Sequence, residues 1–279
     1  NSTPATTVQS GGVAMAGSAS YIITTPDSGN TSPTGDLEWI ADVAVSSWTT
    51  HQTPVSKWLS AGSNNRSFGL EIDASGKLLL FWSSTGSDTL YKLSTVATGW
   101  AAGSRHKIRA RLDVDNGAGG HTVTFEEYSG GTWVAIGSPV VSSGTTSVYN
   151  AAARTVIGAG DDGASGFVNG TIYEVTLNDA IGGSPAFTCN PSAQSDGTAS
   201  WLASTGERWA IAGAATAPLM AWCIAEHSDG AARCGDLSPT TAQVLHIDTV
   251  SATVASTTEQ SILDRAGATQ LVGWIHRVV

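Results

Sequence analysis

The clearest pattern in this chain is the alternation of apolar and polar residues over residues 107–137. That stretch reads as a strand, a glycine loop, a second strand, a tight turn and a third strand: KIRARLDVD, NGAGG, HTVTFEEY, SGG and TWVAIG. In the first strand Ile108, Ala110 and Leu112 alternate with charged residues. A period of two places one face of a strand on a core and the other in water, so the stretch predicts a half-buried antiparallel meander.

The same pattern recurs along most of the chain before residue 185. About a dozen short apolar segments alternate there with turn residues, with almost no helical periodicity. They include ASYIITT, LEWIADVAV, PVSKWLSA, SFGLEID, KLLLFWSS and LYKLSTVA. KLLLFW is apolar on both faces, so this strand is either covered on both sides or presents aromatic side chains to a ligand. The predicted fold class is an all-β sandwich.

Three parts are expected along the chain. Residues 1–12 form a polar lead-in, residues 13–184 the β-sandwich, and residues 185–279 a C-terminal extension or small mixed α/β domain. The third part begins with a hairpin in ASWLASTGERWAIAGAA and contains one helix at 257–266, with a capping box before it and Gly267 after it.

The last residues, QLVGWIHRVV, predict an apolar terminal strand. If such a strand lies at an exposed sheet edge, it pairs with another chain, which would make the C-terminal region an attachment module. If it docks on its own sheet, it serves the fold alone. Both alternatives stay open.

The charge and hydropathy of the chain exclude two classes of partner. Only 13% of the residues are charged, and the formal net charge is −10. A nucleic-acid backbone requires clustered Lys and Arg, which the chain does not show, so we expect no nucleic-acid partner. No stretch approaches the roughly 18 consecutive apolar residues of a spanning helix, so we expect no membrane insertion.

The three cysteines allow several interpretations. Cys223 and Cys234 flank a polar loop whose length permits a disulfide across a hairpin, and His227 between them also suggests zinc. Cys189 stands apart. The zinc spacing lacks a paired Cys-x2-Cys, and ordinary buried thiols are the favoured interpretation.

Two segments resemble a known family. GTIYEVTLNDAI, preceded by Phe167, and RHKIRARLDVDNGAGGHTVTFEEYSGGTW are similar to strands of concanavalin A-like lectin/glucanase jelly rolls of the LamG type, over roughly residues 12–184. More narrowly, SASYIITTPDS, VSKW and ASWLASTGERWAIAGAA resemble LamG-type modules in tail and other virion proteins of bacteriophages that infect actinobacteria. The resemblance implies a structural or host-surface-binding role without catalysis.

Three functions follow as expectations, in this order. The first is a non-enzymatic bacteriophage virion structural protein, a minor tail or capsid-exterior component. Its partners would be other virion proteins, further copies of itself, or a cell-surface glycan. The second is a secreted, extracellular carbohydrate-binding module. The third is a glucanase-like hydrolase, which is the least favoured because no catalytic set stands out.

The carboxylates of the chain are the first candidates for catalytic residues. Related glucanases resemble one another in a Glu-x-Asp-x-x-Glu strand that supplies nucleophile and general acid. Glu71 and Asp73 match the first two positions, but Gly76 occupies the third. We therefore interpret Glu71 and Asp73 as a solvated strand face, and neither a nucleophile elbow nor a phosphate-binding glycine loop is present. No catalytic residue is predicted, and no cofactor is required.

Calcium is a second metal to consider, because LamG-type and lectin domains frequently bind it on loop oxygens. Two loops offer such oxygens: Asp113, Asp115 and Asn116 in one, and Asp161 and Asp162 in the other. The same residues are good turn formers through local hydrogen bonds, and this is the interpretation we favour.

Ten tryptophans in a weakly charged chain suggest stacking against sugar rings. The candidate glycan-binding residues are Trp82, Trp39, Trp58 and Tyr91, which fall on or beside predicted strands. Trp82 leads because it follows the apolar run LLLF, and we expect it to be exposed. The alternative for each residue is core filling.

Overall fold

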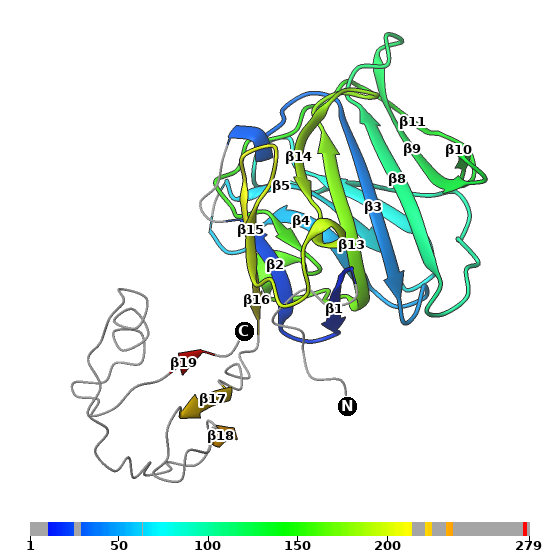
Figure 1. Cartoon of the computed structure of the whole chain (residues 1–279). Coiled ribbons are helices and arrows are strands. Elements are labelled where there is room, and N and C mark those ends of the chain that lie inside the picture. The colour runs from blue at the N-terminus through cyan, green and yellow to red at the C-terminus, as the bar shows by residue number, and fades with distance from the viewer. Residues whose placement is uncertain are drawn as a thin grey trace. The chain divides into compact units, whose positions relative to one another are not determined.

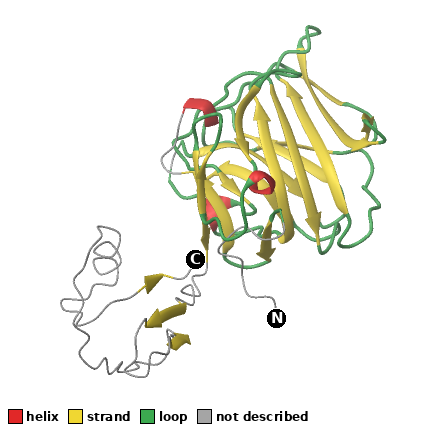
Figure 2. Ribbon diagram, in the orientation of Figure 1, coloured by secondary structure: helices red, strands yellow, loops and turns green. Residues whose placement is uncertain are grey.

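The computed structural model describes residues 11–24, 29–62, 64–213, 221–224, 233–236 and 276–277. The chain divides into two compact units, residues 1–214 and residues 215–279. Within the first unit, two antiparallel sheets lie face to face (Figure 1), and among its described residues the helical segments are three short 3-10 turns (Figure 2). The predicted all-β sandwich is confirmed.

The first sheet has the strand order β1-β13-β3-β8-β9-β10, with β14 also on β13 and β11 also on β9. Its strands are β1 (Val13–Ala16), β3 (Leu37–Val45), β8 (Arg105–Asp113), β9 (Gly120–Ser129), β10 (Thr132–Ala135), β11 (Val140–Ser143), β13 (Asn169–Asn178) and β14 (Pro185–Cys189). The predicted meander is β8, β9 and β10, paired in sequence order.

The second sheet has the strand order β15-β16-β2-β12-β4-β5-β6-β7. Its strands are β2 (Ser20–Thr24), β4 (Gln52–Trp58), β5 (Arg66–Ile72), β6 (Leu78–Trp82), β7 (Leu90–Leu93), β12 (Val156–Ile157), β15 (Ser200–Leu202) and β16 (Arg208–Gly213). The 3-10 turns are η1 (Gly29–Thr31), η2 (Asp161–Gly163) and η3 (Pro191–Ala193).

A chain of aromatic rings joins the two sheets through the core. Trp39 on β3 lies 4.9 Å from Phe68 on β5 and 5.5 Å from Phe187 on β14, measured between ring centroids. Phe187 lies 5.5 Å from Trp209 on β16. All four side chains are buried. Tilted and edge-on rings at these separations add stabilisation beyond the area they bury.

The predicted boundary after residue 184 is wrong. The strands β14, β15 and β16 complete the sandwich, and the compact unit ends at Ala214. Trp201 and Trp209 do face each other across the predicted hairpin, but β16 then pairs with β2, and both indoles are buried in the core. The expected lead-in lies outside the described residues up to residue 10, and the expected helix at 257–266 lies outside them altogether.

In the second unit, the described residues form β17 (Ala221–Ile224), β18 (Arg233–Asp236) and β19 (His276–Arg277). Strand β17 pairs with both others, and the backbone register sets Cys223 opposite Cys234. Their side chains and His227, on which the disulfide and zinc alternatives depend, lie outside the described residues.

Cys189 lies on β14 in the first unit and is a buried free thiol, as expected for an apolar core position. Burial raises its pKa, and the nearby Glu174 adds to the rise. Within the part of the chain that the structure describes, no helix is long and apolar enough to cross a membrane.

The revised boundary gives a truncation test. A fragment of residues 1–214 should melt cooperatively at the temperature of the sandwich in the whole chain. A fragment of residues 1–184 should not fold, because it loses Phe187, Trp201 and Trp209, and each such loss costs about 3–5 kcal/mol. Thermal melts followed by circular dichroism compare the two fragments. If residues 1–184 melt like residues 1–214, β14–β16 are dispensable and the boundary is misplaced.

Candidate functional site

A groove of about 430 Å³ opens on the outer face of the second sheet. Strands β4 to β7 and the segment around η2 supply its lining, and we call this site the groove. Its lining residues are His51, Thr53, Trp58, Ser60, Arg66, Glu71, Leu79, Phe81, Thr89, Tyr91, Gly160, Asp161 and Ser165.

The alternation of β6 provides the apolar part of the groove. Leu78, Leu80 and Trp82 point into the core and are buried, whereas Leu79 and Phe81 are half-buried and line the groove. Successive strand residues face opposite sides of a sheet, so an apolar run serves both faces at once. Of the two interpretations of KLLLFW, this is the one in which aromatic side chains face outward.

Gly69 on β5 allows the ring of Phe81 to lie against the sheet. The two residues are direct cross-strand partners. A Cβ atom placed on Gly69 would lie 2.1 Å from Cζ of Phe81, which shows that the ring covers the glycine. Trp58 stands edge-on to this ring at 5.0 Å between centroids. The absence of a side chain at Gly69 therefore gives the groove its aromatic floor.

The groove lining also contains a histidine in contact with a carboxylate. His51 Nε2 lies 2.8 Å from Glu71 Oε1, and the Glu71 side chain is only 19% exposed. Burial raises the pKa of Glu71; the hydrogen bond and charge of His51 oppose the rise, and Asp73 adds to it. The interpretation of Glu71 as part of a solvated face is wrong, because most of its side chain is shielded from solvent beside His51.

Asp161 reaches the groove from a strained turn. Asp161 and its neighbour Asp162 both have positive φ, 49° and 55°, which is unfavourable for residues with a side chain. Ser60 holds the turn by donating its N–H and its hydroxyl to the two Asp161 oxygens, at 2.6 and 2.7 Å. Arg154 holds Asp162 with two bonds of 2.9 Å. Backbone strain fixed by specific contacts is typical of binding sites.

Arg66 lies at the end of the groove formed by β4 and β5. Its guanidinium carbon is 5.5 Å from the centre of the Trp58 ring, and its Nη1 donates to the Ser87 carbonyl at 2.6 Å. The loop of Ser87 is organised by Asp88, whose carboxylate accepts hydrogen bonds from the segment 83–85. Partial burial works to raise the pKa of Asp88, but these hydrogen bonds outweigh it and lower the pKa far below its usual range.

The structure separates the four aromatic candidates into two pairs. Trp58 and Tyr91 line the groove, and Tyr91 is 55% exposed. Trp82 and Trp39 are 1% and 0% exposed, so the prediction that they contact a glycan, and that Trp82 is exposed, is wrong. Trp82 shares the inward parity of Leu80, and its indole N–H donates to Thr146 Oγ1 at 2.9 Å. Trp39 belongs to the core.

The calcium candidates are engaged by protein groups. Asp115 and Asn116 accept backbone N–H bonds within the β8–β9 turn, and Asp161 and Asp162 accept bonds from Ser60 and Arg154. Asp113 ends β8 in the other sheet. In the described part of the chain, no group of three or more His, Cys, Asp or Glu residues is placed to hold a metal ion. The turn interpretation explains the hydrogen bonds of Asp115 and Asn116.

The other carboxylates near the groove and on the first sheet have partners of their own. Asp73 accepts bonds from the backbone N–H groups of Ser75 and Lys77, both at 2.8 Å, which makes it a turn residue. Glu126 on the first sheet is paired with Arg109 and Arg111. Only Glu71 of the glucanase-like pair lies in the groove.

Sequence reasoning missed one hydrogen-bonded chain of serine, histidine and glutamate. Ser104 Oγ lies 2.7 Å from His106 Nε2, and His106 Nδ1 lies 2.5 Å from Glu127 Oε1. The Ser104 hydroxyl and backbone N–H both donate to the Ala101 carbonyl, and the Trp100 ring stacks on His106 at 4.0 Å. With the serine N–H already bonded, it does not serve as an oxyanion donor. This cluster closes one end of the sandwich.

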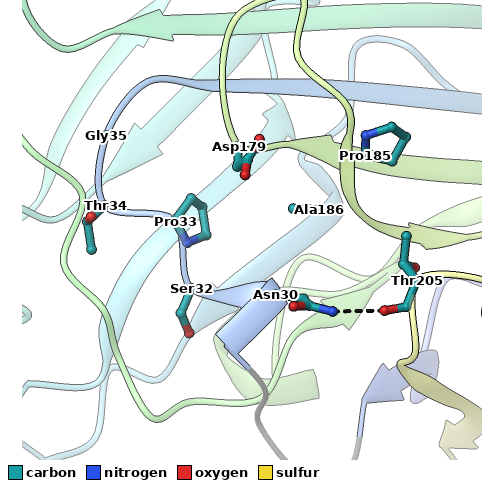
Figure 3. Close-up of a pocket in the computed structure, with 9 residues that line it drawn as sticks. All are labelled: Asn30, Ser32, Pro33, Thr34, Gly35, Asp179, Pro185, Ala186 and Thr205. Atoms are coloured by element: carbon teal, nitrogen blue, oxygen red, sulfur yellow. Dashed lines mark hydrogen bonds between the residues drawn. The ribbon is translucent and has the colours of Figure 1, made fainter.

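A second cavity, of about 660 Å³, lies beside η1 and the β15–β16 turn (Figure 3). Its lining consists of hydroxyl, amide and proline groups with one carboxylate, Asp179, and includes no aromatic side chain. Asn30 points across it, and its amide donates to the Thr205 carbonyl at 2.8 Å and to Glu207 at 2.7 Å. These bonds hold η1 to the hairpin, so we regard this cavity as structural.

No family model and no curated protein sequence matches the chain. The chain is similar to several solved structures. A putative carbohydrate binding protein from Bacteroides ovatus is 11% identical over 69% of this chain and 55% of that chain, with a TM-score of 0.45. The CBM40 of the Ruminococcus gnavus IT-sialidase, bound to alpha2,3 sialyllactose, is 11% identical over 60% and 89%, with a TM-score of 0.42. Domains LG4-5 of the mouse laminin alpha1 chain are 10% identical over 64% and 44%, with a TM-score of 0.41.

Gly69 gives a direct test of the groove floor. In a Gly69→Ala variant the new methyl group should displace the Phe81 ring and lower stability by about 1–3 kcal/mol, the range for overpacking. Urea denaturation measures the loss. Gly35→Ala is the matched control, because no atom lies within 4 Å of its added Cβ, and it should change stability by less than about 0.5 kcal/mol. Equal stability of the two variants would contradict the described floor.

Asp88 gives a test of the loop that holds Arg66. Because its pKa is lowered in the folded state, its contribution to stability is present above the unfolded pKa of about 3.9 and is lost as pH falls through the folded value. The whole chain should therefore lose stability between about pH 5 and pH 2. Asp88→Asn should be less stable at pH 7 and show a flatter acid dependence. The exposed Asp196→Asn should behave like the wild type, and an unchanged profile for Asp88→Asn would refute this account.

Proposed function

We propose that the groove binds a carbohydrate chain without cleaving it. The observation that carries the proposal is the outward placement of Trp58, Phe81 and Tyr91, on β4, β6 and β7, among polar side chains that also line the groove. The C–H faces of sugar rings pack on aromatic rings, and polar neighbours fix the orientation through the hydroxyl groups. An aromatic surface with polar edges meets both needs.

The polar groups of the groove are suited to holding hydroxyl groups. Glu71 and Asp161 accept hydrogen bonds, and Arg66 donates them. The partners of these side chains fix their positions before a ligand arrives: His51 for Glu71, Ser60 for Asp161, and the Ser87 carbonyl for Arg66. A site whose polar groups are already oriented binds at a lower entropic cost.

We propose an extracellular setting for this binding. A bacteriophage virion component would use the groove to contact glycans of the host surface, and a secreted carbohydrate-binding module would use it on a soluble or insoluble polysaccharide. The two settings differ in assembly: a virion component associates with copies of itself or with other virion proteins, and a secreted module acts as a monomer. The molar mass of the purified chain in solution distinguishes them.

The proposal predicts which aromatic side chains carry binding. Trp58→Ala and Tyr91→Ala should each weaken affinity for a glycan identified on an array by at least about tenfold, equivalent to about 1.4 kcal/mol. Tyr128→Ala is the matched control, because Tyr128 is also an exposed aromatic residue but lies on β9 of the other sheet. Isothermal titration calorimetry gives the affinities. Loss of binding in Tyr128→Ala with full binding in Trp58→Ala would place the site elsewhere.

A further inference from the structure

We infer that the groove selects uncharged sugars and discriminates against sugars that carry a carboxylate or a sulfate. The inference rests on the proposed function, because it names the class of glycan that the same groove takes. It follows from the charged side chains that line the groove and from the protein groups that form hydrogen bonds or contacts with each of them.

Two carboxylates line the groove. Glu71 is paired with His51 at 2.8 Å. Asp161 receives its hydrogen bonds from Ser60, which is neutral, so those bonds satisfy its oxygens without neutralising its charge. An anionic ligand next to Asp161 meets a repulsion that an uncharged one does not, and dissolved salt screens this repulsion.

The arginine of the groove is already engaged. Nη1 of Arg66 donates to the Ser87 carbonyl at 2.6 Å, and Thr89 Oγ1 lies 3.5 Å from the same nitrogen. The guanidinium also lies over Trp58. Strong capture of a carboxylate or sulfate by arginine uses two parallel N–H bonds from the guanidinium fork, and one nitrogen of this fork is turned toward the loop.

Sugar hydroxyl groups, in contrast, match the hydrogen-bond donors and acceptors that line the groove. A sugar hydroxyl donates one hydrogen bond and also accepts, so it is able to donate to Glu71 or Asp161 and accept from Arg66. A carboxylate or sulfate only accepts, so it adds no hydrogen bond to Glu71 or Asp161. The formal net charge of −10 adds a long-range repulsion of anionic polymers.

The test compares matched pairs of oligosaccharides on the full chain. Each pair consists of a neutral galactose-, glucose- or mannose-containing oligosaccharide and the same backbone with a sialic acid, uronic acid or sulfate. Titration calorimetry is run at 50 mM and 500 mM NaCl. We expect the neutral member of a bound pair to bind at least about tenfold more tightly, and we expect this ratio to shrink at high salt.

Two variants locate the source of the discrimination. Asp161→Asn should narrow the ratio several-fold, and asparagine tolerates the positive φ of this position. Glu71→Gln is a second route to the same result if Asp161→Asn fails to fold. Asp115→Asn is the matched control, because Asp115 is an exposed aspartate in the β8–β9 turn of the other sheet, and it should leave the ratio unchanged.

The outcomes separate the inference from the proposed function. If the charged member binds as tightly as the neutral one, or more tightly, and Trp58→Ala abolishes this binding, the groove is a glycan site and the inference of neutral selectivity is overturned. If the ratio is the same in Asp161→Asn, Glu71→Gln and the wild type, the lining charges do not cause it and the inference also falls. If no oligosaccharide binds, the proposed function fails and the inference fails with it.

Discussion

The packing of Trp39 against Phe68 and Phe187 is the interaction on which the rest of the structure depends. It is the point where β3 of one sheet meets β5 of the other, and through Phe187 it extends to Trp209 and the last hairpin of the sandwich. Strand β5 is held here on its inner face and supplies the groove on its outer face. The core and the groove therefore share the backbone of this strand.

Alternation along the strands was enough to predict the class of fold. The inward residues of β8 and the three-strand meander follow directly from a period of two, because sheet sterics leave no other way to bury one face. The end of the sandwich did not follow, because the hairpin of Trp201 and Trp209 is recognisable locally but its pairing with β2 joins residues far apart in the sequence. A local pattern does not encode a distant partner.

The candidate site was predictable only in part, for the same reason. Trp58 and Tyr91 stood out as aromatic residues on strands, but Trp82 was misassigned although its parity with Leu78 and Leu80 indicates an inward position. The roles of Gly69 and Asp161 depend on cross-strand register and on a turn from another part of the chain. No spacing within one segment reveals such contacts.

The turn of Asp161 and Asp162 holds backbone strain in the folded chain. Holding two consecutive non-glycine residues at positive φ is costly, and the contacts from Ser60 and Arg154 compensate for it once, when the chain folds. The conformation of the turn is then fixed before a ligand arrives. Binding and release of a ligand at Asp161 would therefore require little rearrangement of this turn.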